Sequence, residues 1–365
     1  MKPLEDTSNP LRLSPREWLV ALGLLAVLCP GLPAVWARLE PPPGGADARI
    51  PYGLGSDYWI FERYSHQPEH SVLALGDSVV WGHYVRTEET LTAQLNRLSP
   101  RAAFVNLGVD GIHPAAMTGL LDYYGRAISG RRVILHCNPL WMTSARRDLT
   151  TDKEENFNHP ALVPQFRPWL RAYSAPLAER IGIVVGHQVP LLQWSRHLEI
   201  AYFDAKDVLG WTLDRPYASP IRQVTLRLPD PNQQPEPPPV AEPWTATGGR
   251  PVSFPWVDLA TSFQWRSFQD SVRLLQRRGN QVFVLVGPFN EHKLTDRSRK
   301  GYQRLKNEIH AWLDAQKVPH LMAQLLRSDL YADASHPLAA GYAAVARELM
   351  ADEAFREFAG LNANR

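Results

Sequence analysis

Short apolar runs separate longer stretches of helical periodicity over much of the chain. The runs at 71–75, 104–109 and 133–135 are almost continuously apolar, which is typical of strands buried on both faces of a parallel sheet. Between them, one helix is predicted to begin near Thr87, with that hydroxyl as its N-cap, and another to cover 115–128. Strand and helix therefore alternate in this part of the chain.

The same alternation returns after residue 260. A helix, a strand, an amphipathic helix, a short strand and a closing helix are predicted in turn, over 261–278, 281–286, 302–313, 320–325 and 342–349. Strands that alternate with helices and are joined by right-handed crossovers form parallel sheets covered on both faces. The pattern therefore predicts the α/β class, as a three-layer α/β/α sandwich.

Residues 139–258 interrupt this alternation. They are rich in Pro, Trp and His and have no clean period, and the part at 229–255 is especially rich in proline. We interpret 139–258 as an insertion in a domain that spans 71–350, with the Pro-rich part exposed. Residues 38–70 would then be a linker and entry segment, and 351–365 a C-terminal tail.

Residues 18–37 form a long uncharged run near the N-terminus. As a helix they would span about 30 Å, the hydrocarbon thickness of a bilayer. We interpret them as an uncleaved transmembrane signal anchor, with 1–17 as a cytoplasmic tail and the domain outside the cytoplasm, periplasmic or extracellular. The basic residues ahead of the run favour this orientation modestly, because Glu5, Asp6 and Glu17 offset Lys2, Arg12 and Arg16.

Two alternatives to an anchor are open. A signal peptide cleaved after Ala37 would leave the domain secreted. A buried core helix is disfavoured, because the run is long and has no amphipathic stripe. With either an uncleaved anchor or a cleaved signal peptide, the globular part acts outside the cytoplasm.

Composition narrows the classes of function. The 365-residue chain has 39 basic and 37 acidic residues, a net charge of +2, which argues against nucleic acid as a partner. Two cysteines, Cys29 and Cys137, exclude a disulfide scaffold, and with Cys29 in the apolar run no intrachain disulfide is expected. The histidines form no spaced metal motif, and the sequence has no phosphate loop or dinucleotide fingerprint. We therefore predict neither a metal nor a cofactor.

A serine stands directly after the first predicted strand. Gly76, Asp77 and Ser78 follow the apolar run, so the serine would lie at the rim of the sheet, where a helix N-terminus can stabilise negative charge. The same tripeptide is also ordinary turn composition. A serine needs an adjacent base before it can attack, so Ser78 alone decides nothing.

An acid and a base lie close together near the C-terminus. Across a predicted turn, Asp333 could reach one nitrogen of His336 and leave the other free to take a proton. Pro337 is expected in the first turn of the closing helix. The alternative is a surface aspartate beside a helix-capping histidine.

Two further residues follow the second and third strands. Gly108 would let a backbone N–H approach a ligand, and Asn138 offers a side-chain N–H to a developing oxyanion. Taken singly, they also fit a turn glycine and an asparagine before proline. Because the carboxyl ends of parallel strands meet at one edge of a sheet, their joint placement favours a single site.

In this order the residues resemble the sequence blocks of the SGNH hydrolases, the superfamily of GDSL-type esterases and lipases. The resemblance covers 71–138 and about 281–350, and it implies a flavodoxin-like sandwich. Val79 stands where the family usually has leucine. The third block reads His136-Cys137-Asn138-Pro139 instead of Gly-x-Asn-Asp, so its asparagine is retained and the neighbours of that asparagine are not.

The resemblance also implies a role for each residue. Ser78 would be the nucleophile, with His336 as the base and Asp333 as the third member of the triad. Ser78, Gly108 and Asn138 would form the oxyanion hole. The chemistry implied is acyl transfer through a covalent ester on the serine, without a metal or an organic cofactor.

Three functions fit this set of residues. The first is a serine esterase, with O-acetyl groups of an envelope or extracellular glycan as a substrate class. The second is an O-acetyltransferase of polysaccharide modification with the same triad. The third is a non-catalytic module that binds glycan or protein, which only the altered third block supports.

Aromatic and imidazole side chains add candidates for substrate contact. His113 and His136 adjoin the proposed site in sequence order. The tryptophans of the insertion could stack on sugar rings, and they are Trp141, Trp169, Trp194 and Trp211.

Overall fold

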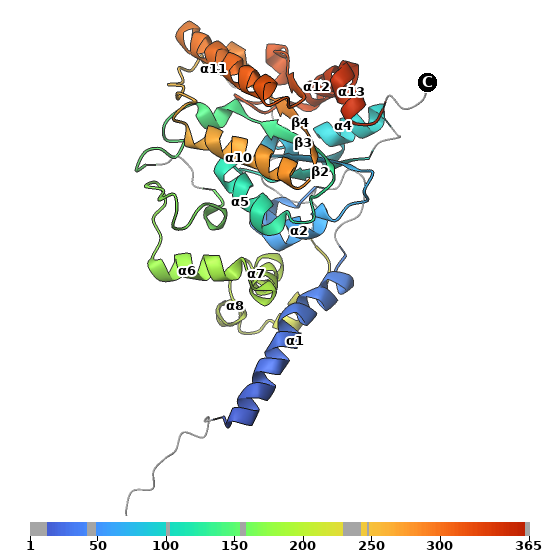
Figure 1. The fold of residues 1–365 in the computed structure, drawn as a ribbon, viewed down its shortest axis with the longest axis vertical. Coiled ribbons are helices and arrows are strands. Elements are labelled where there is room, and N and C mark those ends of the chain that lie inside the picture. Colours follow the sequence, from blue (N-terminus) through green and yellow to red (C-terminus); the bar gives the residue numbers. More distant parts are fainter. Residues whose placement is uncertain are drawn as a thin grey trace, which may run out of the picture.

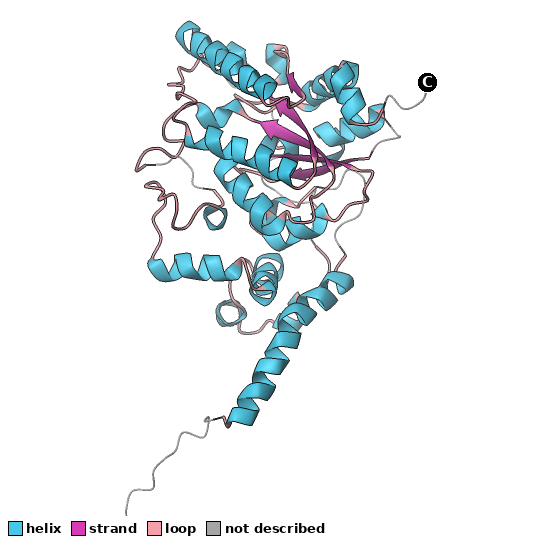
Figure 2. Ribbon diagram, in the orientation of Figure 1, coloured by secondary structure: helices cyan, strands magenta, loops and turns pink. Residues whose placement is uncertain are grey.

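Five parallel strands form one sheet in the order β2-β1-β3-β4-β5 (Figure 2). The computed structural model describes residues 13–41, 49–99, 103–153, 158–228, 242–246 and 248–361. The strands are β1 (Val72–Gly76), β2 (Phe104–Gly108), β3 (Arg132–Cys137), β4 (Gln281–Val286) and β5 (His320–Met322). The α/β class and the parallel sheet are confirmed.

The strands are apolar because both of their faces are covered. In β1, Val72 and Ala74 pack in one apolar cluster, whereas Leu73 and Leu75 pack in another. Side chains alternate between the two faces of a strand, so each cluster lies on its own face of the sheet. A continuous apolar run is the sequence pattern that such a doubly covered strand requires.

Helices supply the cover on each side (Figure 1). The first cluster joins the sheet to α2 (Tyr58–Ser65), α5 (Pro114–Tyr124), α10 (Phe263–Arg277) and α11 (Asp296–Ala315). The second joins it to α4 (Leu91–Leu98), α12 (Ala339–Ala351) and α13 (Glu353–Phe358).

A helical layer and one long helix lie beyond α2 and α5 (Figure 1). The long helix, α1 (Pro15–Leu39), is long and apolar enough to cross a membrane, and little of its surface is buried. The layer comes from the predicted insertion and contains α6 (Leu177–Gly186), α7 (Pro190–Tyr202), α8 (Val208–Asp214) and α9 (Pro220–Gln223). These four helices were not predicted from the sequence. Residues 229–241 of the Pro-rich part lie outside the described residues.

Three predicted boundaries differ from the structure. The helix expected at Thr87 is α4, and its N-cap is Thr90, because 87–89 form a separate short 3-10 turn. The expected tail at 351–365 contains α13, whose Phe355 is buried on the sheet. Pro337 precedes the closing helix rather than starting it, because α12 begins at Ala339.

The strand order reverses between β1 and β3, which places a topological switch point at the carboxyl ends of these two strands. From β1 the chain crosses to β2 on one side and then returns to β3 on the other. At such a switch point the loops that follow neighbouring strands diverge, and ligands bind there outside the carboxyl ends of the strands. Ser78 and Asn138 follow the two strands concerned, β1 and β3.

Candidate active site

The turn after β1 holds Ser78 at the start of α3 (Ser78–Trp81). Asp77 caps this short helix, because its Oδ1 accepts a hydrogen bond from the Val79 N–H at 3.1 Å. A side chain on Gly76 would collide with Val80 and His136, so the turn needs a glycine there. Ser78 is buried, with 8% of its surface exposed.

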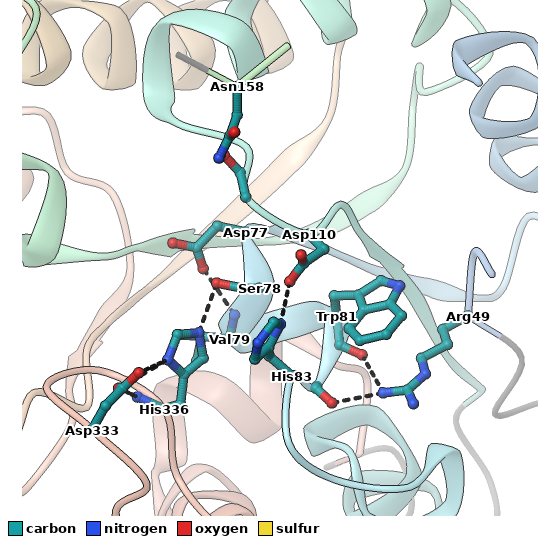
Figure 3. A network of polar contacts seen from close by, with 12 residues as sticks. Arg49, Asp77, Ser78, Val79, Trp81, His83, Asp110, Asn158, Asp333 and His336 are labelled. Atoms are coloured by element: carbon teal, nitrogen blue, oxygen red, sulfur yellow. Dashed lines mark hydrogen bonds and ion pairs between the residues drawn. The ribbon is translucent and has the colours of Figure 1, made fainter. Parts of the chain in front are cut away.

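Three residues from opposite ends of the chain make one hydrogen-bonded row at this turn (Figure 3). Nε2 of His336 lies 2.8 Å from Oγ of Ser78. On the other side of the ring, Nδ1 lies 2.9 Å from Oδ1 and 2.8 Å from Oδ2 of Asp333. Serine, imidazole and carboxylate therefore have the contacts of a nucleophile, a base and an orienting acid.

In the loop between β5 and α12, the Asp333 carboxylate accepts hydrogen bonds from the loop's own backbone. Its Oδ1 accepts the backbone N–H groups of Ser335 and His336, at 2.9 and 3.0 Å. The side chain of Asn290 donates to the Asp333 carbonyl. A carboxylate with this many donors is fixed in place, so the imidazole that it holds is fixed too.

The charges of the row favour a proton on the imidazole. Burial would raise the pKa of Asp333, but the charge and hydrogen bond of His336 hold that pKa well below its usual range. Burial alone would lower the pKa of His336, and the charge of Asp333 outweighs it, so the net pKa of His336 is raised. Asp333 therefore stays ionised and stabilises the imidazolium that forms when Ser78 loses its proton.

The predicted oxyanion donors divide into two groups. No hydrogen bond within the described residues takes up the Ser78 N–H. Asn138 is buried, and its Nδ2 donates one hydrogen bond to Asp77 Oδ2 at 2.7 Å, so the amide has a second N–H to offer.

The third predicted donor, the backbone N–H of Gly108, already has an acceptor in the structure. This N–H donates to Oδ1 of Asn106 at 3.0 Å, and the Gly108 Cα packs so closely on α3 that a side chain would collide with the backbone of Trp81. The structural need for a glycine here is close packing. Gly111, farther along the same loop with φ of 72°, has an N–H with no acceptor among the described residues.

Asp77 connects the nucleophile turn to the loop after β3. Besides Asn138, its carboxylate accepts the indole N–H of Trp141 at 3.0 Å, and its Oδ1 lies 3.2 Å from Nδ1 of His136. Burial would raise the pKa of Asp77, but His136 and Asn138 lower it overall. An ionised, buried Asp77 therefore fixes Asn138 beside Ser78.

Of the two histidines predicted to contact substrate, His113 lines a recess together with Trp141, and both His113 and His136 are buried and hydrogen-bonded. His136 is buried, and its Nε2 lies 2.9 Å from the Gly287 carbonyl while its other nitrogen faces Asp77. His113 caps α5 through Nδ1, and its Nε2 bonds to the Asn158 carbonyl. Burial lowers the pKa of His113 to about 3, which keeps the ring neutral. Both side chains support the loops of the site.

The four tryptophans proposed for sugar stacking have different positions. Trp211 is buried among insertion residues, and Trp194 packs edge-on against Trp36 of α1. Trp169 is exposed under the guanidinium of Arg180. Only Trp141 of these adjoins the site, where it lines a recess with Arg146, Arg147 and Asn158 among others.

A second histidine–carboxylate pair lies beside the row, and the sequence interpretation missed it. Nδ1 of His83 lies 2.7 Å from Oδ1 of Asp110, and its ring centroid is 5.2 Å from that of His336 (Figure 3). His83 follows α3 and Asp110 follows β2, so both belong to the loops of the switch point. Both residues lie within a few positions of Ser78 or Gly108 in the sequence, and this closeness could have marked them as site candidates.

One group of side chains within the described ranges could hold a metal ion. It consists of His310, Asp314 and His320, whose ligand atoms lie within 4.8 Å of one another on α11 and β5. No triad residue belongs to it, so it bears on a separate part of the molecule.

Comparison with known proteins identifies no family for this chain. A scan against protein-family models finds no match to this chain, and a search of curated proteins finds none either.

Proposed function

We propose that this protein is a serine esterase of the SGNH type, which cleaves ester bonds through an acyl-enzyme on Ser78. The observation that carries the proposal is the hydrogen-bonded row of Ser78, His336 and Asp333. Strand order 2-1-3-4-5, the flavodoxin-like order, supports the fold that the sequence resemblance implies.

The mechanism follows from the distances. His336 Nε2, 2.8 Å from Ser78 Oγ, takes the hydroxyl proton as the oxygen attacks the ester carbon. Asp333 stabilises the resulting imidazolium. His336 then returns the proton to the departing alcohol, which leaves an acyl group on Ser78. An acceptor hydroxyl, deprotonated by the same imidazole, attacks the acyl carbon. The bond between Ser78 Oγ and the acyl carbon then breaks, and His336 returns the proton to Ser78 Oγ.

The negative charge that develops on the carbonyl oxygen needs donors at the same edge. We assign this role to the N–H of Ser78 and the side chain of Asn138. Removal of one such donor costs about 3 kcal/mol of transition-state stabilisation. Because Asp77 anchors the Asn138 amide, this donor does not need to reorganise during the reaction.

The neighbouring recess supports a polar, ring-containing substrate. Trp141, Arg146 and Arg147 line this recess. An O-acetylated glycan combines sugar rings with ester groups, and it is the substrate class that we propose.

A second acceptor is chemically compatible with the acyl-enzyme. His83, tied to Asp110, places another imidazole next to His336, where it can orient an incoming hydroxyl. If that hydroxyl belongs to a sugar, the protein is an O-acetyltransferase. If the hydroxyl belongs to water, the protein is an esterase. Transfer of acetyl to an oligosaccharide that outpaces hydrolysis would support the transferase.

We further propose that α1 anchors the protein in a membrane without cleavage after Ala37. Trp36, which precedes the proposed cleavage point, packs against Trp194 and Tyr202 of α7. Cleavage would remove this contact from the folded domain.

The test is hydrolysis of a chromogenic acetate ester by the full chain in detergent. Ser78→Ala should abolish hydrolysis, whereas Ser253→Ala, a matched change at an exposed serine, should leave it unchanged. Equal rates for wild type and Ser78→Ala would reject the proposed function.

A further inference from the structure

The helices of the insertion present apolar side chains to the outside. We call this surface the insertion face and define it by Leu177, Ile181, Val185, Leu209, Leu213 and Ile221. These side chains come from α6, α8 and α9, and the most exposed is Ile221 at 85%. Isolated apolar side chains are common on protein surfaces, but a group of them on adjoining helices indicates a contact with another apolar phase.

The helix α8 has apolar side chains on its inner side and on its outer side. Trp211 points into the protein and is 1% exposed, whereas Leu209 and Leu213, four positions apart, are 70% and 72% exposed. In α6 the exposed positions Leu177, Ile181 and Val185 also recur every four residues, which places them on one side of that helix. Within the described residues, these exposed apolar side chains of α6 and α8 have no partner.

The insertion face adjoins α1. In Figure 1 the layer of α6, α7 and α8 forms the side of the body from which α1 projects, and α8 lies next to α1. Trp211 of α8 belongs to an apolar cluster against which Trp36 of α1 packs, so the insertion and α1 are neighbours in the fold. Figure 2 shows that the sheet lies on the opposite side of this helical layer.

Buried charges fix α1 to the insertion. Glu40, at the end of α1, accepts hydrogen bonds from Tyr202 and Arg63, and its carboxylate lies 2.9 Å from Nε2 of His197 on α7. Nδ1 of His197 lies 2.6 Å from Oδ2 of Asp57, the N-cap of α2. Together with the Trp36–Trp194 contact, this cluster ties α1, α2 and α7 together, so the direction of α1 sets the direction of the insertion face.

We propose that the insertion face lies in the interfacial layer of the same bilayer that α1 crosses, with its apolar side chains among the upper acyl chains. This inference rests on the proposed anchoring of α1. Helices whose apolar sides face a membrane lie in its plane and bury those sides at the boundary between headgroups and chains. The catalytic sheet is then held at a fixed distance and orientation above the membrane instead of hanging from a flexible tether.

Lipid is the occupant that the position favours. A second copy or another protein could cover an apolar face anywhere on the molecule, but this face adjoins the one helix, among the described residues, that is long and apolar enough to span a bilayer. The α1 helix would bring the face to the membrane surface without further association.

The test uses nitroxide labels on the full chain, with Cys29 replaced by alanine. Labels are placed at Leu213→Cys, Ile221→Cys and, as a control, Arg304→Cys on the exposed side of α11. The protein is reconstituted into vesicles of equal parts phosphatidylcholine and phosphatidylglycerol. Collision rates are then measured with oxygen, which concentrates in lipid, and with a water-soluble nickel chelate.

We expect oxygen to dominate at 213 and 221 and the nickel chelate to dominate at 304. Nickel access at 213 and 221 equal to that at 304 would overturn the inference. Labels at 213 and 221 that are immobilised and shielded from both reagents would also overturn it, because that result indicates a protein partner. Flotation of the same samples tests the anchor separately, and acetate hydrolysis tests the proposed enzyme, so the three failures are distinguishable.

Discussion

The catalytic edge and the insertion face are organised in opposite ways. At the edge, side chains from the loops after β1 and β3 and before α12 converge, and Ser78, His336 and Asp333 are joined by hydrogen bonds. On the insertion face, the apolar side chains of α6, α8 and α9 are exposed and have no packing partner among the described residues. Convergent polar groups are typical of chemistry on a small ligand, and divergent apolar groups of contact with an extended surface. Variants at the catalytic edge should therefore leave membrane contact unchanged, and variants on the insertion face should leave catalysis unchanged.

The largest effect is expected at the base. His336→Gln retains a group that can contact Ser78 but cannot accept its proton, so kcat should fall by about 10⁶-fold. Acetate hydrolysis measures it, with His70→Gln at an exposed histidine as the control. A loss smaller than about 10²-fold would mean that another group acts as the base.

A smaller loss is expected at the acid. Asp333→Asn keeps the shape of the loop but removes the charge that stabilises the imidazolium, so kcat should fall by about 10⁴-fold. The pH profile provides a second readout. Asp333 raises the pKa of His336, so in the wild type the acid limb of kcat/KM should lie above about pH 6.5, and in the variant it should move to lower pH. An unchanged limb would contradict the assignment of the base.

An intermediate effect on stability is expected in the insertion. Trp211→Ala empties a buried site and should lower the free energy of unfolding by about 3–5 kcal/mol. The exposed change Leu213→Ala should cost less than about 0.5 kcal/mol in detergent. Thermal unfolding compares them. If Trp211→Ala also reduced kcat per labelled Ser78 at temperatures where it is folded, the two regions would be coupled.

The neighbouring imidazole should have a more modest effect on catalysis. His83→Asn preserves a donor for Asp110 but lacks the second ring nitrogen, so kcat should fall by about 10²-fold if that nitrogen orients the acceptor. The rate of Ser78 acylation, measured in a single turnover, should change less than the rate of deacylation. Equal losses in both steps would assign His83 to the structure of the site.

The smallest effect concerns the cluster that fixes α1. Burial alone would lower the pKa of His197, but Asp57 and Glu40 raise it to about 9. Because the folded-state pKa is the higher one, the stabilisation is fully present below about pH 6.5 and is lost as the pH rises through 9. The melting temperature of wild type should therefore approach that of His197→Gln between about pH 7 and pH 10. A constant difference over this range would exclude a charged His197.

The sequence predicted one of these regions much better than the other. The strands were predictable because burial on both faces leaves a continuous apolar run, and Ser78 and Asn138 follow such runs. The role of Gly108 could not be decided from the sequence, because close packing on α3 and donation to an oxyanion both require a glycine in that loop. The structure shows the close packing and a hydrogen bond from the Gly108 N–H to Asn106.

The insertion helices were not predictable for a related physical reason. Helical periodicity is visible when one side of a helix is apolar and the other polar. In α8 the inner Trp211 and the outer Leu213 are both apolar, so the period disappears. The pairs His197–Asp57 and His83–Asp110 join residues far apart in the chain, and nothing in the local pattern marks them as partners.

The central claim is that His336 activates Ser78, and labelling with a fluorophosphonate tests it most directly. Such probes react with serines whose proton a neighbouring base removes, and mass spectrometry locates the adduct. The account predicts one adduct, on Ser78, that forms rapidly in the wild type and is lost in His336→Gln. An unlabelled Ser78 in the folded wild type, or equal labelling in the variant, would contradict it.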